Sequence, residues 1–374
     1  MHNASVLYRL AGLILLAIAI CTLVGCAGGP APTARHALDW QSEGVTQLPA
    51  VAHALPRALP PAAPATNPPV ASAPKEKFSG SWVPVARWCR SVSLPEPACL
   101  ATTPLPSYAL TTTNGTFTFR AGSQIANWAG VELRLGFAPQ WIDRQPYLHT
   151  LDLNKTVKPL LSGMSMACSN SRPVLVLDPG HGGEDSGTRS ALGHDWEKQF
   201  TLDWARRVQS LLATNGWDVF LTRDNDRELG LSNRVAFADQ HRADLFLSLH
   251  FNSAAADAGQ AGLETYCLTP AGMPSSITRG YEDDARLVFP NNAYDAQNLQ
   301  LALRLHRTLL QVNGHLDRGV RRARFLSVLR TQQRPAVLIE GGYLSNKREA
   351  RLISDPAYRQ KLAEAVVRGL GIPL

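Results

Sequence analysis

The sequence lacks several features that would assign it to a common class. It contains no HExxH or HxxEH segment, which excludes the helical motifs of the common zinc proteases. None of its six cysteines stands in a CxxC spacing. Its net charge of +7 over 374 residues is modest, and it gives no reason to expect a nucleic-acid partner. A basic excess of this size remains compatible with anionic polymers such as cell-wall glycans.

The N-terminus has the pattern of an export signal. Arg9 precedes an apolar stretch at 10–24 that is too short to assign as a membrane span, and small residues lead from it to Cys26. We therefore predict that residues 1–25 form a signal peptide. The ending Leu-Val-Gly-Cys resembles the lipobox of bacterial lipoproteins, which implies lipidation of Cys26. Because Ala27 rather than Asp follows, we expect an outer-membrane anchor facing the periplasm; an uncleaved membrane anchor is the alternative.

Two regions of different composition follow the signal. Residues 26–77 are rich in Ala and Pro and have no helical or strand period, which predicts an extended tether. Residues 78–161 contain β-favouring stretches, with an Asn-Gly pair at 114–115 between two Thr-rich runs. We predict a small β-rich module there. Its tryptophans either form a sugar-stacking surface that binds the cell wall or, as we favour, pack in its core.

Export sets the redox context of the remaining cysteines. Cys89 and Cys99 are ten residues apart in the β-rich module and are expected to pair in an oxidising compartment. Two buried thiols are the alternative. Cys168 and Cys267 are expected to be unpaired structural residues.

From residue 172 onward the pattern alternates between strand and helix. Short apolar runs bounded by Gly and Pro are typical of buried strands in a mainly parallel sheet. We predict strands at 173–178, 217–222, 244–249, 262–268, 325–329 and 335–340, and helices near 196–214, 231–241, 295–313 and 356–369. The predicted fold is an α/β domain over 172–374, with a doubly wound, mainly parallel or mixed sheet and helices on both faces.

Three of the predicted strands end in residues that bind metals or move protons. The run VLVLD leads to His181, DLFLSL leads to His250, and AVLI leads to Glu340. In open sheets the ligand crevice lies beyond the carboxyl ends of the strands, so we expect these side chains to meet there. A carboxylate at the end of an apolar run is costly to bury without a function. The alternative for Glu340 is a side chain that turns into solvent.

Glu197, at the start of a predicted helix, is the fourth candidate. His181, Glu197 and His250 would hold Zn²⁺ with one open position, as catalytic zinc sites do. Glu340 would take a proton from water and pass it to the departing amine. Glu197 has a simpler explanation as an acidic residue near a helix N-terminus. Three nearby residues could take its place: His194, Glu184 and Asp185.

Residues 172–374 resemble the catalytic domain of the zinc-dependent N-acetylmuramoyl-L-alanine amidases, which are bacterial peptidoglycan hydrolases. The matching segments are VLVLDPGHGGEDSG, EKQFTLDWARRV, the Thr-Arg pair at 222–223, Arg234 with ADLFLSLHFNS, and PAVLIEGGYLSN. The resemblance implies that His181, Glu197 and His250 bind zinc and that Glu340 is catalytic. It also implies that the substrate is peptidoglycan, cleaved between N-acetylmuramic acid and the L-alanine of the stem peptide, in the periplasm or outside the cell.

Two segments need separate interpretation. Residues 270–296 form an extra segment, and relatives sometimes hold a helix near this position that blocks the zinc. Acidic side chains that would cap the metal in that way are Glu282, Asp283 and Asp284. We favour a surface loop. The arginines at 318–330 either meet stem-peptide carboxylates or form a solvated basic face.

Two other functions fit the same sequence. One is a zinc deacetylase or peptidase that acts on another wall component, which the mass of digested muropeptides would distinguish. The other is a lipid-tethered, non-catalytic wall-binding or activator protein. The intact set of candidate residues argues against a dead site. The sequence does not identify a protein activator.

Overall fold

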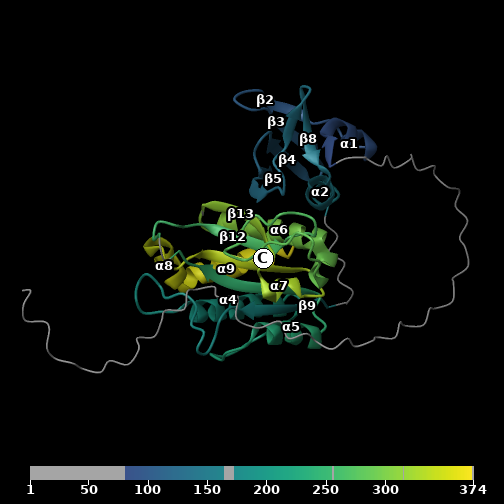
Figure 1. Ribbon diagram of the computed structural model, residues 1–374. Helices are drawn as coiled ribbons and strands as arrows, with labels where there is room; N and C mark the ends of the chain where they lie inside the picture. Colours follow the sequence, from purple (N-terminus) through teal and green to yellow (C-terminus); the bar gives the residue numbers. More distant parts are fainter. Residues whose placement is uncertain (1–80, 164–171, 255–256, 315, 373–374) are drawn as a thin grey trace, which may run out of the picture. The chain divides into compact units, whose positions relative to one another are not determined.

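The computed structural model describes residues 81–163, 172–254, 257–314 and 316–372 (Figure 1). The predicted signal peptide, the predicted tether and Cys26 lie outside these residues, as does Cys168. No helix in these ranges is long and apolar enough to cross a membrane.

The N-terminal module is built mainly from short strands. Its elements are β1 (Trp82–Pro84), α1 (Val85–Ser91), β2 (Ala98–Ala101), β3 (Ser107–Thr112), β4 (Gly115–Arg120), β5 (Ile125–Trp128), β6 (Val131–Arg134), β7 (Gln140–Ile142), β8 (Gln145–His149), α2 (Thr150–Asp152), the π-helical η1 (Leu153–Val157) and α3 (Lys158–Leu161). Strands β2 to β6 form an antiparallel meander. The predicted hairpin is β3–β4, and its turn falls at residues 113–114, one residue earlier than expected.

The C-terminal region alternates strands and helices as predicted. Its elements are β9 (Val174–Pro179), α4 (Glu197–Ala213), β10 (Asp218–Leu221), α5 (Leu231–Gln240), β11 (Leu245–Asn252), β12 (Leu263–Leu268), the 3-10 helix η2 (Pro290–Tyr294), α6 (Asp295–Asn313), β13 (Asp317–Ala323), α7 (Ser327–Arg330), β14 (Ala336–Tyr343), α8 (Lys347–Ser354) and α9 (Pro356–Gly369). Helices α6 and α9 have the predicted bounds.

The sheet of this region confirms the predicted mixed α/β fold. Its strand order is β10-β9-β11-β14-β12-β13. All neighbours are parallel except β12 and β14, which are antiparallel. Helices α4, α6 and α9 pack on one face of the sheet, and α5 and α7 cover the other. The hydrophobic residues of each strand alternate between the two layers, as burial on both faces requires.

The predicted strand at 325–329 is wrong. The strand is β13 (Asp317–Ala323), and α7 begins four residues later, at Ser327. The sequence of β13 is DRGVRRA, which has no apolar run to indicate a strand. Its arginines are accommodated because the folded chain supplies partners, such as Thr156 Oγ1, which lies 2.8 Å from Nη1 of Arg322. Tertiary contacts therefore override the local pattern.

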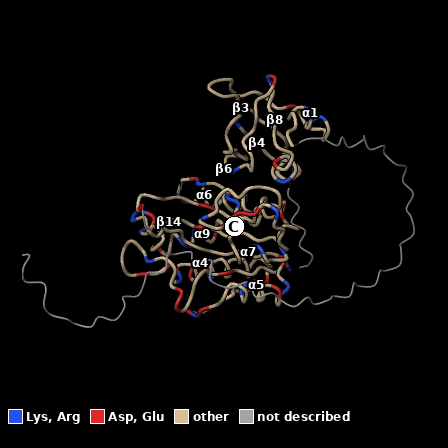
Figure 2. Tube along the Cα trace, in the orientation of Figure 1, with Lys and Arg blue, Asp and Glu red and all other residues tan. Residues whose placement is uncertain are grey.

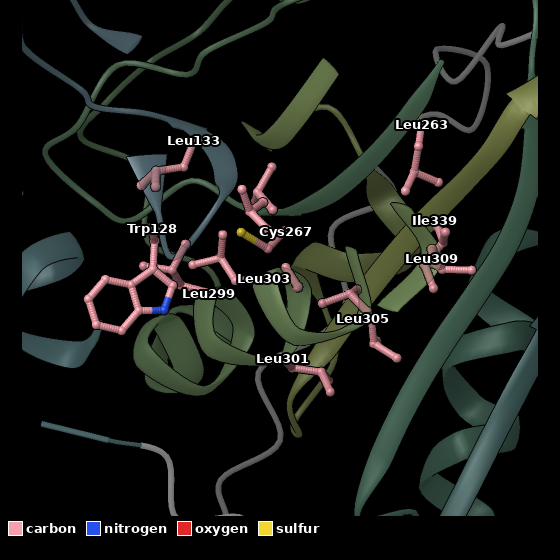
Figure 3. Packing of buried hydrophobic residues seen from close by; sticks show 14 of the residues in the cluster. Trp128, Leu133, Leu263, Cys267, Leu299, Leu301, Leu303, Leu305, Leu309 and Ile339 are labelled. Atoms are coloured by element: carbon pink, nitrogen blue, oxygen red, sulfur yellow. The ribbon is translucent and has the colours of Figure 1, made fainter. Parts of the chain in front are cut away.

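The module and the C-terminal region share one hydrophobic core. Strand β6 pairs in parallel with β13 through Leu133 and Val320, which extends the sheet to eleven strands. Trp128 and Leu133 belong to the same buried cluster as Leu299 and Leu303 of α6 (Figure 3). The strand addition and the common core make the module a structural continuation of the sheet.

The side chains of the module mostly favour the packing interpretation. Trp88 and Trp128 are buried, whereas Trp141 is 41% exposed. The expected disulfide is not formed: Cys89 is buried on α1, and Cys99 is exposed on strand β2. The alternative of two buried thiols is also wrong, because only Cys89 of the two is buried.

Candidate metal centre

His181 is held at the end of β9 by a tightly packed glycine loop. A Cβ atom on Gly180 would lie only 2.2 Å from Cε1 of His250, so no larger residue fits beside the His250 imidazole. The rings of His181 and His250 are 4.9 Å apart, edge to face. Gly187, with φ of +65°, brings the loop back, and a Cβ there would lie 2.7 Å from both His181 and Glu197. The glycines thus allow the backbone to pass directly beside the candidate ligands.

One nitrogen of His181 is already engaged by a carboxylate. Its Nδ1 lies 2.8 Å from Oδ1 of Asp185, which orients the ring and leaves Nε2 facing the cluster. That Nε2 is buried and has no hydrogen-bond partner among the described residues, although Oε2 of Glu197 lies 3.1 Å away. An imidazole fixed through one nitrogen and presented through the other is the usual arrangement of a metal-binding histidine.

Glu197 is the first residue of α4 and is buried against the strand ends. Its Oε1 accepts hydrogen bonds from the backbone N–H of Phe251 at 3.0 Å, and it lies 3.0 Å from Nδ1 of His250. Its Oε2 accepts from the backbone N–H of Thr188 at 3.1 Å. Burial alone would raise the pKa of Glu197, but His181 and His250 outweigh it and hold this pKa well below its usual range. The carboxylate is therefore anionic and rigidly placed.

The three predicted ligands converge in space. One ligand atom each from His181, Glu197 and His250 lie within 4.8 Å of one another, and all three residues are buried. Burial alone would lower the pKa of His181, but Glu197 and Asp185 raise it to about 10. The cluster thus attracts positive charge. Two imidazoles and one carboxylate, with a buried His181 Nε2 that has no hydrogen-bond partner within the described chain, fit a divalent cation with nitrogen and oxygen ligands.

Glu340 lies beside this cluster on the neighbouring strand. It is the register partner of His250 in the parallel pair β11–β14, so the two side chains share one face of the sheet. It is 2% exposed, and its Oε2 has no hydrogen-bond partner within the described chain. Burial raises the pKa of Glu340 to about 8, and the nearby Glu197 carboxylate adds to the rise. The predicted alternative, a glutamate that turns into solvent, is therefore wrong.

Two arginines brace the loop that carries His181. Arg234 donates to Oδ1 of Asp178 at 2.7 Å and to the carbonyl of His181 at 3.0 Å. Arg223 donates to the carbonyls of Pro179 at 3.0 Å and of Gly180 at 2.8 Å. These charge-assisted bonds satisfy carbonyls that the sharp turn removes from the sheet.

The structure also separates the weaker candidates from the cluster. Asp185 orients His181 and is not one of the three clustered residues. Glu184 and His194 do not belong to the cluster either. In the extra segment, Asp283 pairs with Arg324, Asp284 pairs with Arg286, and Glu282 is exposed. None of these three acidic residues belongs to the cluster, which is expected of a surface loop rather than of a metal cap.

The comparison with protein families assigns the chain. Residues 175–371, more than half of the chain, match the model described as N-acetylmuramoyl-L-alanine amidase. The chain belongs to this family.

Individual relatives agree with the family. The chain is 33% identical over 223 residues to the N-acetylmuramoyl-L-alanine amidase AmiA of Escherichia coli K12, covering 54% of this chain and 76% of AmiA. It is 33% identical over 219 residues to AmiC of Neisseria meningitidis serogroup B, covering 53% of this chain and 52% of AmiC. The solved catalytic domain of CwlV from Bacillus (Paenibacillus) polymyxa var. colistinus is 31% identical, with a TM-score of 0.44, and covers 53% of this chain and 96% of that domain. The chain thus spans three quarters of AmiA but only half of AmiC.

Proposed function

We propose that this protein is a zinc-dependent N-acetylmuramoyl-L-alanine amidase. It would hydrolyse the amide bond between N-acetylmuramic acid and the L-alanine of peptidoglycan stem peptides. The observation that carries the proposal is the buried cluster of His181, Glu197 and His250 within 4.8 Å, with Glu340 in register beside it, in a chain of the amidase family. Because nitrogen and carboxylate oxygen suit zinc and an open fourth position suits hydrolysis, we assign Zn²⁺ as the metal.

Each residue has a distinct role in this proposal. His181, Glu197 and His250 would bind the metal, and Asp185 would hold the His181 ring in the orientation that presents Nε2. Zn²⁺, when bound, supplies a Lewis acid that lowers the pKa of water toward about 7 and polarises the scissile carbonyl. The backbone N–H groups of Phe251 and Thr188 keep the Glu197 carboxylate in place.

Glu340 would move the proton. Its Oε2, which has no hydrogen-bond partner in the described chain, would accept a proton from the attacking water. The same oxygen would then donate it to the amine nitrogen, because an amide nitrogen leaves poorly without protonation. A raised pKa, about 8, suits a group that must both accept and return a proton near neutral pH.

A lipid-tethered wall-binding or activator protein without catalysis is the second candidate. A protein without catalysis has no need of a buried carboxylate oxygen that lacks a hydrogen bond, and such an atom is costly to bury. Oε2 of Glu340 is such an atom within the described chain, so the enzyme is the better supported function.

Digestion of purified peptidoglycan sacculi tests the proposal. The protein should release stem peptides with a free L-alanine amine, identified by mass, and a chelator should stop the release until Zn²⁺ is restored. Binding to sacculi without any release would favour the second candidate. Cleavage at another bond would favour a deacetylase or peptidase.

We also propose that the chain is exported and anchored by lipid at Cys26, with residues 26–77 as the tether to the module at 78–161 and the amidase domain at 172–374. The expected location is the periplasmic face of the outer membrane. Cys26→Ala should move the protein from the membrane fraction to the soluble periplasmic fraction. Continued membrane recovery would indicate an uncleaved anchor.

A further inference from the structure

A second group of buried charges lies next to Glu340, on the side away from the metal cluster. Glu264 of β12 is the register partner of Glu340 in the antiparallel pair β12–β14, so its side chain occupies the same face of the sheet. Glu264 is 3% exposed. Its position extends the row that begins with His250 and Glu340 toward β13.

The hydrogen bonds of Glu264 are already filled by the fold. Its Oε2 accepts from Nδ2 of Asn252 at 2.9 Å and from the hydroxyl of Tyr266 at 2.6 Å. Its Oε1 accepts from Nε of Arg318 at 2.8 Å. The carboxylate therefore has three close donors and needs no further cation.

Two more guanidinium groups nevertheless lie close to the Glu264 carboxylate. Arg279 reaches within 3.8 Å of Glu264, and Arg321 reaches within 3.9 Å. Arg279 makes one hydrogen bond in the described chain, from Nη2 to the Tyr266 hydroxyl at 2.8 Å. The side chain of Arg321 makes no hydrogen bond in the described chain, and its Nε is buried without a partner there. Because strand β6 runs beside β13 in register, Arg134 lies on the same face as Arg321.

Four arginines, Arg134, Arg279, Arg318 and Arg321, thus lie near three carboxyl groups, those of Glu132, Glu264 and Glu340, so that positive charge exceeds negative charge at this point of the sheet. Acidic and basic residues are otherwise interspersed along the described chain (Figure 2). Half-buried guanidinium groups whose N–H donors lack hydrogen-bond acceptors are costly in free energy unless an anion accepts from them. The planar arrangement of these N–H groups matches a carboxylate.

We propose that Arg279 and Arg321 form a specificity subsite for a free carboxylate of the peptide that the reaction releases, with Arg134 adding positive charge. This inference rests on the proposed amidase function. Adjacent strands are about 4.8 Å apart, so β13 lies roughly 10 Å from Glu340. An extended peptide advances about 3.4 Å per residue, and the carboxylate would therefore belong to the second or third residue beyond the scissile bond.

The position of Arg279 also gives the extra segment 270–296 a role. Its guanidinium lies 5.5 Å from the centre of the Tyr266 ring and 5.8 Å from that of Phe325. These contacts hold a residue of the segment against the sheet face that carries Glu340. The segment would therefore contribute to substrate selection.

A pair of substrates tests the subsite with the zinc-loaded, unmodified protein. One is a muramoyl peptide whose second or third residue carries a free carboxylate, and the other is its carboxamide counterpart. The carboxamide should raise KM about tenfold while kcat changes less than about twofold, as loss of a charge-assisted hydrogen bond predicts.

Variants then locate the effect. In Arg279→Gln and Arg321→Gln, the KM difference between the two substrates should shrink to less than about twofold. Arg286→Gln is the matched control, because Arg286 belongs to the same segment but its side chain is 91% exposed and pairs with Asp284. It should keep the full tenfold difference.

The outcomes separate this inference from the proposed function. If the unmodified protein cleaves neither substrate, the amidase function fails. If it cleaves both with the same KM, the subsite alone is wrong, even where a variant fails to fold. Folded arginine variants that retain the tenfold preference would also overturn it.

Discussion

Two buried carboxylates, one in each region of the molecule, differ in their hydrogen bonding. Asp152 in the N-terminal module is fully buried and accepts from the backbone N–H groups of Gly136 and Phe137, each at 2.9 Å. Glu340 in the amidase region is equally inaccessible, yet its Oε2 has no partner among the described residues. A carboxylate that the fold satisfies stabilises a loop, whereas one that the fold leaves open is available for chemistry.

The strands of the two regions also differ in how far they are buried. Strands β11 and β14 are buried at every position, whereas β6 alternates buried and half-buried residues. A charged residue in a strand buried on both faces has no route to solvent, so its retention indicates a function. Four substitutions test this contrast.

The largest effect is expected for Glu340→Gln. Losing the group that transfers the proton should lower hydrolysis of sacculi by about 10²–10⁴-fold. Zinc content should stay the same, because Glu340 is not one of the three clustered residues. The melting temperature should change little, because a carboxyl with a pKa of about 8 is mostly protonated near neutral pH and glutamine is neutral as well. A variant that retains full hydrolysis would remove Glu340 as the base.

Asp152→Ala should show the opposite behaviour. Leaving two buried N–H groups without an acceptor should cost about 2–4 kcal/mol of stability. Thermal unfolding should record the loss, and kcat of the folded protein should remain within about twofold. A large drop in kcat without a change in melting temperature would contradict the structural role.

Asp185→Asn should have an intermediate effect on the metal cluster. Weakening the carboxylate that orients His181 should reduce zinc affinity by about 10–100-fold. Competition with a chromophoric chelator measures this affinity directly. Glu184→Gln, at the adjacent position outside the cluster, is the control and should leave zinc affinity unchanged.

The smallest effect is a pH-dependent change in stability at the seam between the two regions, where strands β6 and β13 pair. Asp317 of β13 accepts from the backbone N–H of Glu132 at 2.9 Å and lies 2.9 Å from Nε2 of His306. Burial alone would raise the pKa of Asp317, but His306 and the backbone N–H groups of Glu132 and Gly319 together outweigh it and keep the pKa below its usual value. Its stabilisation is therefore present above about pH 4 and is lost as the pH falls through the lowered value.

Thermal unfolding between pH 5 and pH 3 checks this expectation. The unmodified protein should lose more stability over this range than Asp317→Asn, by about 1 kcal/mol. Parallel pH curves for the two proteins would show that Asp317 does not couple the seam to pH.

The sequence predicted the elements whose local pattern is strong. Helices α6 and α9 have the expected bounds, because an apolar stripe and end signals define a helix locally. Strand β13 was missed because its partners lie far along the chain, where Arg322 contacts Thr156. The expected pairing of Cys89 with Cys99 was wrong for a related reason, since spacing does not reveal which way a thiol points.

For the candidate site, the sequence by itself determined which residues stand at the strand ends, because apolar runs that stop at His181, His250 and Glu340 are local features. The residue pattern left Asp185 open as an alternative to Glu197, and the resemblance to the amidase family favoured Glu197. The tertiary structure brings Glu197 rather than Asp185 into the cluster with the imidazoles, and it alone placed Glu264 with its arginines beside Glu340. Strand register and loop closure set these neighbours, and both depend on contacts between residues distant in the chain.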